Sequence, residues 1–182
     1  YETSKQYEII SADDTSLAHT ADFFASDFCV SDGSDFGTDR TDSQVCGASG
    51  VFNLNQKEVT YSQNIYGRMY PASTTKILTA YLALKYGDLD AVFTVSENAA
   101  DQAADSSVCH LKAGDRLTLE QLLYGLMMQS GNDAAVAIAE GISGDVDTFA
   151  ELMNQEASAL GAIDSHFINP HGLHNEKHYT TV

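Results

Sequence analysis

The sequence predicts an α/β (α+β) domain in which a hairpin of two antiparallel strands precedes several helices. Residues 51–54 and 59–62 are short β-prone segments, and the polar run 55–58 between them has the composition of a turn. From residue 71 onward, apolar side chains recur at helical spacing instead of alternating. A two-stranded hairpin is marginal by itself. No other convincing strand follows it in the sequence, so the predicted sheet is unfinished.

Four helices are predicted after the hairpin. The first begins near Pro71, because a first helical turn does not use the N–H that proline lacks, and it ends at Gly87. Thr118 and Gln121 have the spacing of a capping box for the second helix. Residues 133–140 are apolar nearly all round, as in a buried helix, and a further helix runs from about residue 145 to Leu160. The apolar positions at helical spacing are Ile77, Ala80, Tyr81 and Leu84 in the first helix, Leu119, Leu122, Leu123 and Leu126 in the second, and Val146, Phe149, Met153 and Leu160 in the last.

The first 48 residues differ from the rest in composition. They are rich in Asp, Ser, Thr and Gly, and such a run favours turns and loops and buries little apolar surface. We therefore expect two parts, an acidic loop-rich N-terminal segment at residues 1–48 and a folded domain at residues 49–182.

Charge and cysteine content narrow the function classes. The chain has 26 acidic and 9 basic side chains, for a formal net charge of −17. An acidic surface repels phosphate backbones, so nucleic acid is not expected as a partner. No stretch reaches the roughly 18 apolar residues that a membrane-spanning helix needs, so no transmembrane segment is predicted in this chain. The three cysteines, Cys29, Cys46 and Cys109, match no metal motif, and the sequence leaves open whether Cys29 pairs with Cys46.

Ser73 and Lys76 form a Ser-x-x-Lys pattern, and no other serine in the chain has a lysine three residues on. Side chains at this spacing share a helix face, with Cβ atoms about 5–6 Å apart. In a first helical turn, free backbone N–H groups stabilise a developing anion at the serine. A neutral Lys76 with a lowered pKa can then take the serine proton. An ordinary solvated helix start would show the same two residues.

Ser130, Gly131 and Asn132 lie in a predicted turn between two helices. By default, such a turn only caps the helix that follows. Beside Ser73 and Lys76, however, it supplies what acyl transfer needs. The Ser130 hydroxyl can relay a proton to a departing nitrogen, and the Asn132 amide offers both a donor and an acceptor for a substrate amide.

These motifs resemble the first two of the three motifs of penicillin-binding proteins and serine β-lactamases. The surrounding blocks are most similar to the low-molecular-mass D-alanyl-D-alanine carboxypeptidases, which are serine peptidases of that superfamily. The resemblance runs from about residue 50 to the end of the chain. Its blocks are Pro-Ala-Ser-Thr-Thr-Lys at 71–76, Leu-Leu-Tyr-Gly-Leu-Met at 122–127, Ser-Gly-Asn-Asp-Ala-Ala at 130–135, Asn-Pro-His-Gly-Leu at 169–173 and His-Tyr-Thr-Thr at 178–181.

The resemblance implies a β-lactamase/transpeptidase-like fold, with an antiparallel sheet packed against helices and an all-helical subdomain, for residues 49–182. It implies an extracytoplasmic, secreted or envelope-associated carboxypeptidase that needs no cofactor or metal. Such an enzyme cleaves peptidoglycan stem peptides ending in D-Ala-D-Ala and binds β-lactam antibiotics. Ser73 would be the nucleophile, Lys76 its general base, Ser130 the proton relay and Asn132 a substrate-binding residue. The backbone N–H of Ser73 would form half of an oxyanion hole.

Two other functions stay open at this point. A serine β-lactamase shares the fold, although it favours Ser-Asp-Asn where this chain has Gly131, and an activating glutamate on a later loop where this chain has residues 169–172. A non-catalytic penicillin-binding sensor would also carry Ser-x-x-Lys. Release of D-alanine from a D-Ala-D-Ala peptide separates the peptidase from the sensor.

The third family motif, Lys-Thr-Gly, is absent from this sequence. Lys57, Lys112 and Lys177 are followed by Glu, Ala and His. In the family this motif lies on a sheet strand beyond the point that corresponds to Val182, and the predicted hairpin lacks strands as well. We therefore expect the chain to be C-terminally incomplete, through truncation or because a partner fragment supplies the rest. We expect these residues alone to have little or no peptidase activity.

Four histidines, His166, His171, His174 and His178, lie close together near the end of the chain. Their spacing is irregular, with no cysteine among them and no helical His-x-x-x-His pair, which argues against a metal site. We expect structural roles for them.

Overall fold

The structure is a computed structural model that describes residues 7–9, 19–21, 35, 37, 46–53, 55–56 and 58–182. The chain divides into two compact units. The first contains Tyr1–Met69, Ser158–Asp164 and Thr180–Val182, and the second contains Tyr70–Ala157 and Ser165–Tyr179. Most of the predicted N-terminal segment 1–48 lies outside the described ranges, so the boundary at residue 48 stays a prediction.

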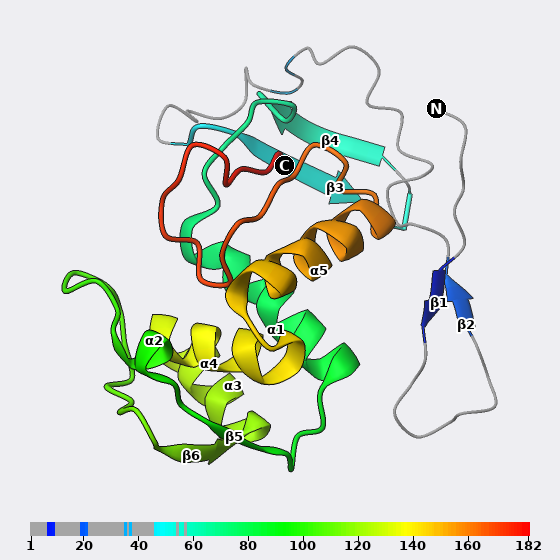
Figure 1. Ribbon diagram of the computed structural model, residues 1–182. Helices are drawn as coiled ribbons and strands as arrows, with labels where there is room; N and C mark the ends of the chain where they lie inside the picture. The colour runs from blue at the N-terminus through cyan, green and yellow to red at the C-terminus, as the bar shows by residue number, and fades with distance from the viewer. Residues whose placement is uncertain are drawn as a thin grey trace. The chain divides into compact units, whose positions relative to one another are not determined.

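The first unit contains two antiparallel hairpins (Figure 1). Strand β1 (Tyr7–Ile9) pairs with β2 (His19–Ala21), and β3 (Ser49–Asn53) pairs with β4 (Glu58–Gln63). The second pair confirms the predicted hairpin, although its strands begin earlier than expected and Leu54 and Lys57 lie outside the described residues. Further along the chain, Met69 forms an antiparallel bridge with Thr180.

The second unit is mainly helical. It contains the 3₁₀ turn η2 (Ala72–Thr74) and the helices α1 (Thr75–Tyr86), α2 (Glu97–Ala100), α3 (Leu119–Met128), α4 (Asn132–Ser143) and most of α5 (Val146–Ala159). Helix α4 lies at its centre and contacts α1, α2, α3 and the strand β5 (Val92–Thr94) (Figure 1). Every residue from Asn132 to Ala139 is buried, which confirms the buried helix predicted from the apolar run. The capping box of α3 is also confirmed, since Thr118 and Gln121 exchange both hydrogen bonds.

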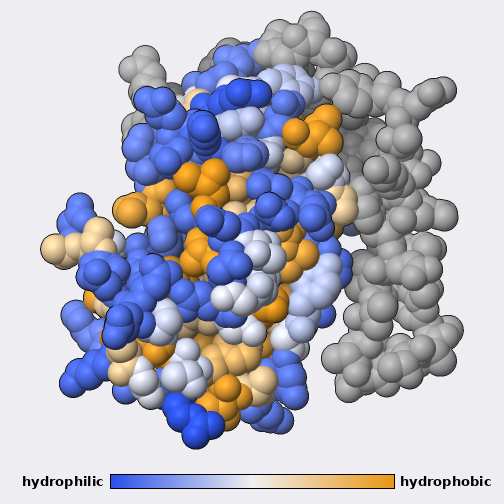
Figure 2. Space-filling model, in the orientation of Figure 1, coloured by the Kyte–Doolittle hydropathy of each residue, from blue (hydrophilic) through white to orange (hydrophobic). Residues whose placement is uncertain are grey.

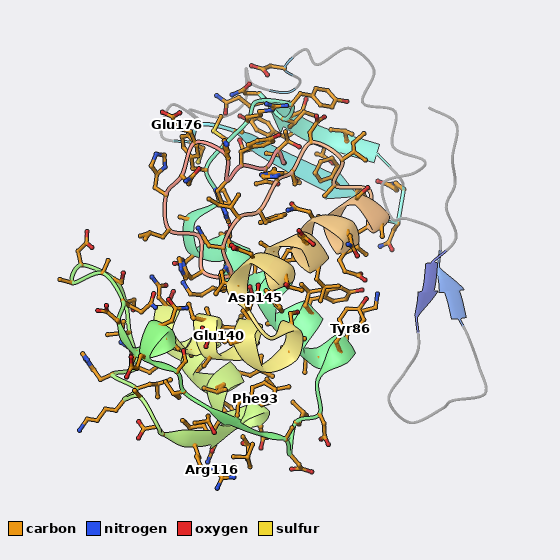
Figure 3. The ribbon with its side chains drawn as sticks, viewed as in Figure 1. Tyr86, Phe93, Arg116, Glu140, Asp145 and Glu176 are labelled. Carbon is orange, nitrogen blue, oxygen red and sulfur yellow. The ribbon has the colours of Figure 1, made fainter. Side chains whose placement is uncertain are left out.

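A short antiparallel strand pair in this unit was not predicted from the sequence. Strand β5 (Val92–Thr94) pairs with β6 (Arg116–Thr118), so the expectation of no further strands is wrong. Strands of three residues are too short to show the alternation by which a strand is recognised. Phe93, labelled in Figure 3, packs against α4 at Gly141. A Cβ on Gly141 would approach the Phe93 ring to 2.2 Å.

Two apolar clusters form the core of the second unit. The larger lies around α4, and the smaller joins α1, α4, α5 and the segment after α5. Phe149 and Met153, two members of the stripe predicted for α5, are fully buried in the smaller cluster. The buried members of the larger cluster are Ala83, Val95, Ala99, Leu119, Leu122, Leu126, Ala134, Ala135, Val136, Ala137 and Ile138, and those of the smaller are Leu82, Ala139, Phe149, Met153, Ala157 and Phe167.

Helix α1 confirms the first predicted helix, but it begins at Thr75 after the 3₁₀ turn instead of near Pro71, and it does not bury the predicted stripe. Ile77 and Leu84 are 64% and 62% exposed, whereas the polar side chains of Thr75, Lys76 and Thr79 are buried. Helical spacing identified the helix but not the face that packs. A buried polar group needs hydrogen-bond partners, and the partners of these three residues lie in the site described below.

The described surface is largely polar on one side. The face shown in Figure 2 is mostly hydrophilic, with hydrophobic areas between the hydrophilic residues. Within the described part of the chain, no helix has the length and hydropathy required to span a bilayer. Cys46 and Cys109 are free thiols, and Cys29 lies outside the described residues.

Candidate active site

Ser73 and Lys76 lie at the start of α1 and face each other. Ser73 is in the 3₁₀ turn η2 and not in the α-helix itself, and its side chain is exposed. Lys76 is the second residue of α1 and is buried, with 3% of its surface exposed. The Lys76 Nζ atom lies 3.2 Å from Ser73 Oγ. A ligand can therefore reach the hydroxyl from solvent while the amine beside it stays buried.

The Lys76 amine has two closer partners besides Ser73. It donates to Asn132 Oδ1 at 2.8 Å and to the backbone carbonyl oxygen of His171 at 2.9 Å. A neutral amine has two N–H donors and one lone pair. When these two acceptors take both donors, the lone pair is left facing Ser73 Oγ. This is the geometry in which an amine accepts a proton from a hydroxyl.

Burial brings the amine close to its neutral form. Desolvation lowers the pKa of Lys76 from 10.5 to about 8, because removal from water disfavours the charged form. A pKa near the working pH suits a general base, since a usable fraction is deprotonated and the proton is still held firmly.

Asn132 is the first residue of α4 and brings the second predicted motif to Lys76. It is buried, and its backbone N–H donates to the Ser107 carbonyl at 2.8 Å. Ser130 is two residues earlier, with a φ of 57° that non-glycine residues rarely adopt. The hydrogen bonds therefore join Ser73, Lys76 and Asn132 directly, and they bring in Ser130 only through its place in the same turn.

The carboxylate of Asp133 holds the turn at residues 130–132 against the loop that contains Cys109 and Leu111. Asp133 is 1% exposed and accepts from the backbone N–H groups of Cys109 and Ala134 at 2.9 Å and of Leu111 at 3.0 Å. A Cβ on Gly131 would approach Cys109 Sγ to 2.5 Å and Asp133 Oδ1 to 2.8 Å. Because any side chain at position 131 meets these atoms, the Ser-Asp-Asn sequence favoured by lactamases does not fit this turn without a shift of its neighbours.

We expect Asp133→Asn to destabilise the protein by about 1–3 kcal/mol, because the amide NH₂ would face backbone donors and leave one buried N–H without an acceptor. The measurement is the urea midpoint at constant m-value. The matched control is Asp105→Asn, which makes the same change at an exposed position in the neighbouring loop. Equal midpoints for the two variants would count against this role of Asp133.

The site also includes the loop 169–173, to which the sequence assigned no catalytic or binding role. In the sequence this block carried part of the resemblance to the family, and it lies where a lactamase would have its activating glutamate. In the structure its Pro170 carbonyl accepts from Thr79 Oγ1 at 2.6 Å, and its His171 carbonyl accepts from Lys76. Gly172 has a φ of +86° and lies so close to α1 that an added Cβ would be 1.7 Å from the Ala72 carbonyl oxygen. Three polar residues on one face of a predicted helix were the signal that could have located this contact.

Two of the four histidines singled out in the sequence make contacts within the fold. His178 is buried, with Thr75 Oγ1 at 2.8 Å, and His166 lies against Tyr179. Among the described residues, no group of three or more His, Cys, Asp or Glu side chains is placed to hold a metal ion. The chemistry that the site offers is thus an exposed hydroxyl and an amide side chain, each within hydrogen-bond distance of the same buried amine.

Comparison with known proteins identifies the family. The D-alanyl-D-alanine carboxypeptidase family of peptidases, S11, matches residues 41–182. The chain belongs to this family. It is 42% identical over 131 residues to the D-alanyl-D-alanine carboxypeptidase DacF of Bacillus subtilis, covering 69% of this chain and 33% of DacF. It is 36% identical over 142 residues to DacA of Escherichia coli, covering 72% of this chain and 35% of DacA.

A solved structure agrees with the fold that the sequence resemblance implied. The D-alanyl-D-alanine carboxypeptidase DacD from Francisella tularensis is 36% identical with a TM-score of 0.67, over 74% of this chain and 33% of that chain. This confirms the penicillin-binding-protein fold class. The chain spans about a third of the length of both DacF and DacA.

Proposed function

We propose that the protein is a serine-type D-Ala-D-Ala carboxypeptidase that acts on peptidoglycan stem peptides through an acyl-enzyme on Ser73, and that it binds β-lactams at the same serine. Membership of the carboxypeptidase family supports this function. The observation that carries it is the position of Lys76 Nζ, 3.2 Å from Ser73 Oγ and held by two other acceptors.

The proposed reaction has two steps. Ser73 Oγ attacks the carbonyl carbon of the penultimate D-alanine while its proton passes to the lone pair of Lys76. The peptide C–N bond then breaks, and the terminal D-alanine leaves with a proton delivered through the Ser130 hydroxyl. Water attacks the resulting ester, which releases the shortened peptide and restores the Ser73 hydroxyl.

Asn132 and the turn before α1 complete the proposed site. The Asn132 amide has a carbonyl oxygen that accepts from Lys76 and an NH₂ group that remains for the peptide backbone of the substrate. The Ser73 backbone N–H supplies one donor to the oxyanion that forms at the attacked carbonyl. We place the protein outside the cytoplasm, secreted or attached to the cell envelope, because its proposed substrate is found there.

The test is the intact mass of the full-length protein after incubation with benzylpenicillin. We expect a single adduct of one penicillin, located at Ser73 by peptide mapping and absent in Ser73→Ala. Release of D-alanine from a synthetic peptide ending in D-Ala-D-Ala should require the same serine. An adduct that persists in Ser73→Ala, or an unlabelled wild-type protein, would exclude the proposed site. Labelling without any D-alanine release would indicate a sensor.

A further inference from the structure

His178 is a buried histidine that the proposed reaction does not use. It is 1% exposed, and its ring meets the buried Phe167 ring edge-on, with centroids 5.4 Å apart. The Ile168 backbone N–H donates to His178 Nδ1 at 3.2 Å. Because Nδ1 accepts, a neutral ring carries its proton on Nε2. The Nε2–H therefore donates to Thr75 Oγ1 at 2.8 Å.

Both bonds are placed where they affect the candidate active site. The bond to Ile168 joins the two ends of the segment 168–178, which contains the loop against α1. The bond to Thr75 fastens that closed segment to the first residue of α1, adjacent to Lys76. Within the segment, the His171 carbonyl accepts from the Lys76 amine. The same ring thus joins the helix that carries Lys76 to the loop that orients its amine.

We propose that His178 is a positioning residue. Acting through Thr75, it keeps the 169–173 loop closed over Lys76, so that the His171 carbonyl holds the amine toward Ser73 and water is excluded from it. The catalytic importance of this arrangement rests on the function proposed above, whereas the effect of His178 on Lys76 does not.

The ionisation of the neighbouring groups is compatible with this role. Burial is the main cause that lowers the pKa of His178 to about 4, and the charge of His166 contributes less. Burial is also the main cause that lowers the pKa of His171 to about 4, and the charges of Lys76 and His178 contribute less. Both rings are therefore neutral above pH 6, and a titration near pH 8 in this region reports Lys76.

The experiment measures the Lys76 amine directly, by ¹³C NMR of the full-length protein labelled at lysine Cε, with the resonance assigned from Lys76→Met. We expect a midpoint of about 8 in the wild type. In His178→Gln, which loses the acceptor for Ile168, and in Thr75→Val, which loses the partner of the ring, the loop opens and water reaches the amine. The midpoint then rises by about one unit, and benzylpenicillin acylation at pH 7 falls about tenfold with little change above pH 10.

Two controls separate positioning from general destabilisation. His174→Gln makes the same substitution at an exposed position of the same 168–178 segment and should leave the midpoint unchanged. The double variant His178→Gln/Thr75→Val should shift the midpoint no further than either single variant, because the two residues act as one unit. A protein that is only less stable loses signal at every pH without a change of midpoint.

The outcomes are distinct for the two proposals. If Lys76 titrates at the same pH in the wild type, His178→Gln and Thr75→Val, the positioning role is overturned, whether or not penicillin reacts. If the midpoint shifts but no variant and no wild-type protein is acylated, His178 positions Lys76 and the proposed peptidase function fails.

Discussion

Replacing Lys76 with methionine should reduce the rate of benzylpenicillin acylation at pH 9 by about 10²–10⁴-fold, the range typical for loss of a general base. Methionine fills much of the same buried space but has no lone pair of comparable basicity to face Ser73. Lys76→Arg should be equally inactive, because a guanidinium stays protonated and cannot accept a proton. The rate is measured by stopped-flow or by intact mass at short times.

The same base predicts the pH dependence of the wild type. The pKa of Lys76 is lowered to about 8 by burial, so the amine is charged below this pH and neutral above it. The acylation rate should therefore rise through pH 8 and level off above it. Lys112→Met, the same substitution at an exposed lysine, should keep both the rate and the profile. A rate independent of pH between 6 and 10, or an active Lys76→Arg, would remove Lys76 from the role of base.

The sequence was sufficient for the elements that have a local signal. The capping box of α3 and the buried helix α4 each follow from residues close together in the chain, and both are confirmed. The antiparallel pair β5–β6 was missed because each strand has three residues, too few for a pattern. The packed face of α1 was also missed, since the apolar stripe with Ile77 and Leu84 is exposed.

In the candidate site, too, the sequence predicted contacts between residues close in the chain but not those between distant residues. The spacing of Ser73 and Lys76 was enough to expect their side chains on one face, and they lie 3.2 Å apart. The approach of Asn132 to Lys76 depends on how α4 packs against α1, which only the resemblance to the family suggested. Residue type could not identify the His171 carbonyl as the acceptor, because any residue supplies a backbone oxygen. The polar face of α1, with Thr75, Lys76 and Thr79, indicated only that some polar partner packs there. The catalytic assignments themselves remain predictions for the experiments above.

Gly172→Ala should be the most damaging change outside the four proposed site residues. At a φ of +86° a Cβ costs roughly 1–2 kcal/mol by itself. Here the Cβ would also lie 1.7 Å from the Ala72 carbonyl oxygen and 2.9 Å from Thr75 Oγ1. A backbone oxygen cannot move aside as a flexible side chain can, so the loop must lift away from η2 and carry the His171 carbonyl away from Lys76.

Gly114→Ala is the matched control for this variant, because it separates strain from lack of space. Gly114 has a φ of +89°, and a Cβ there would meet nothing within 4 Å. Both variants should be destabilised by the strain of a Cβ at positive φ, which is measured as a drop in the urea midpoint. Gly172→Ala should lose roughly 1–3 kcal/mol more through overpacking, and its acylation by benzylpenicillin should fall at least about tenfold while that of Gly114→Ala is unchanged. Equal stability and equal acylation rates in the two variants would mean that the close approach of the 169–173 loop to the turn that carries Ser73 does not govern the site.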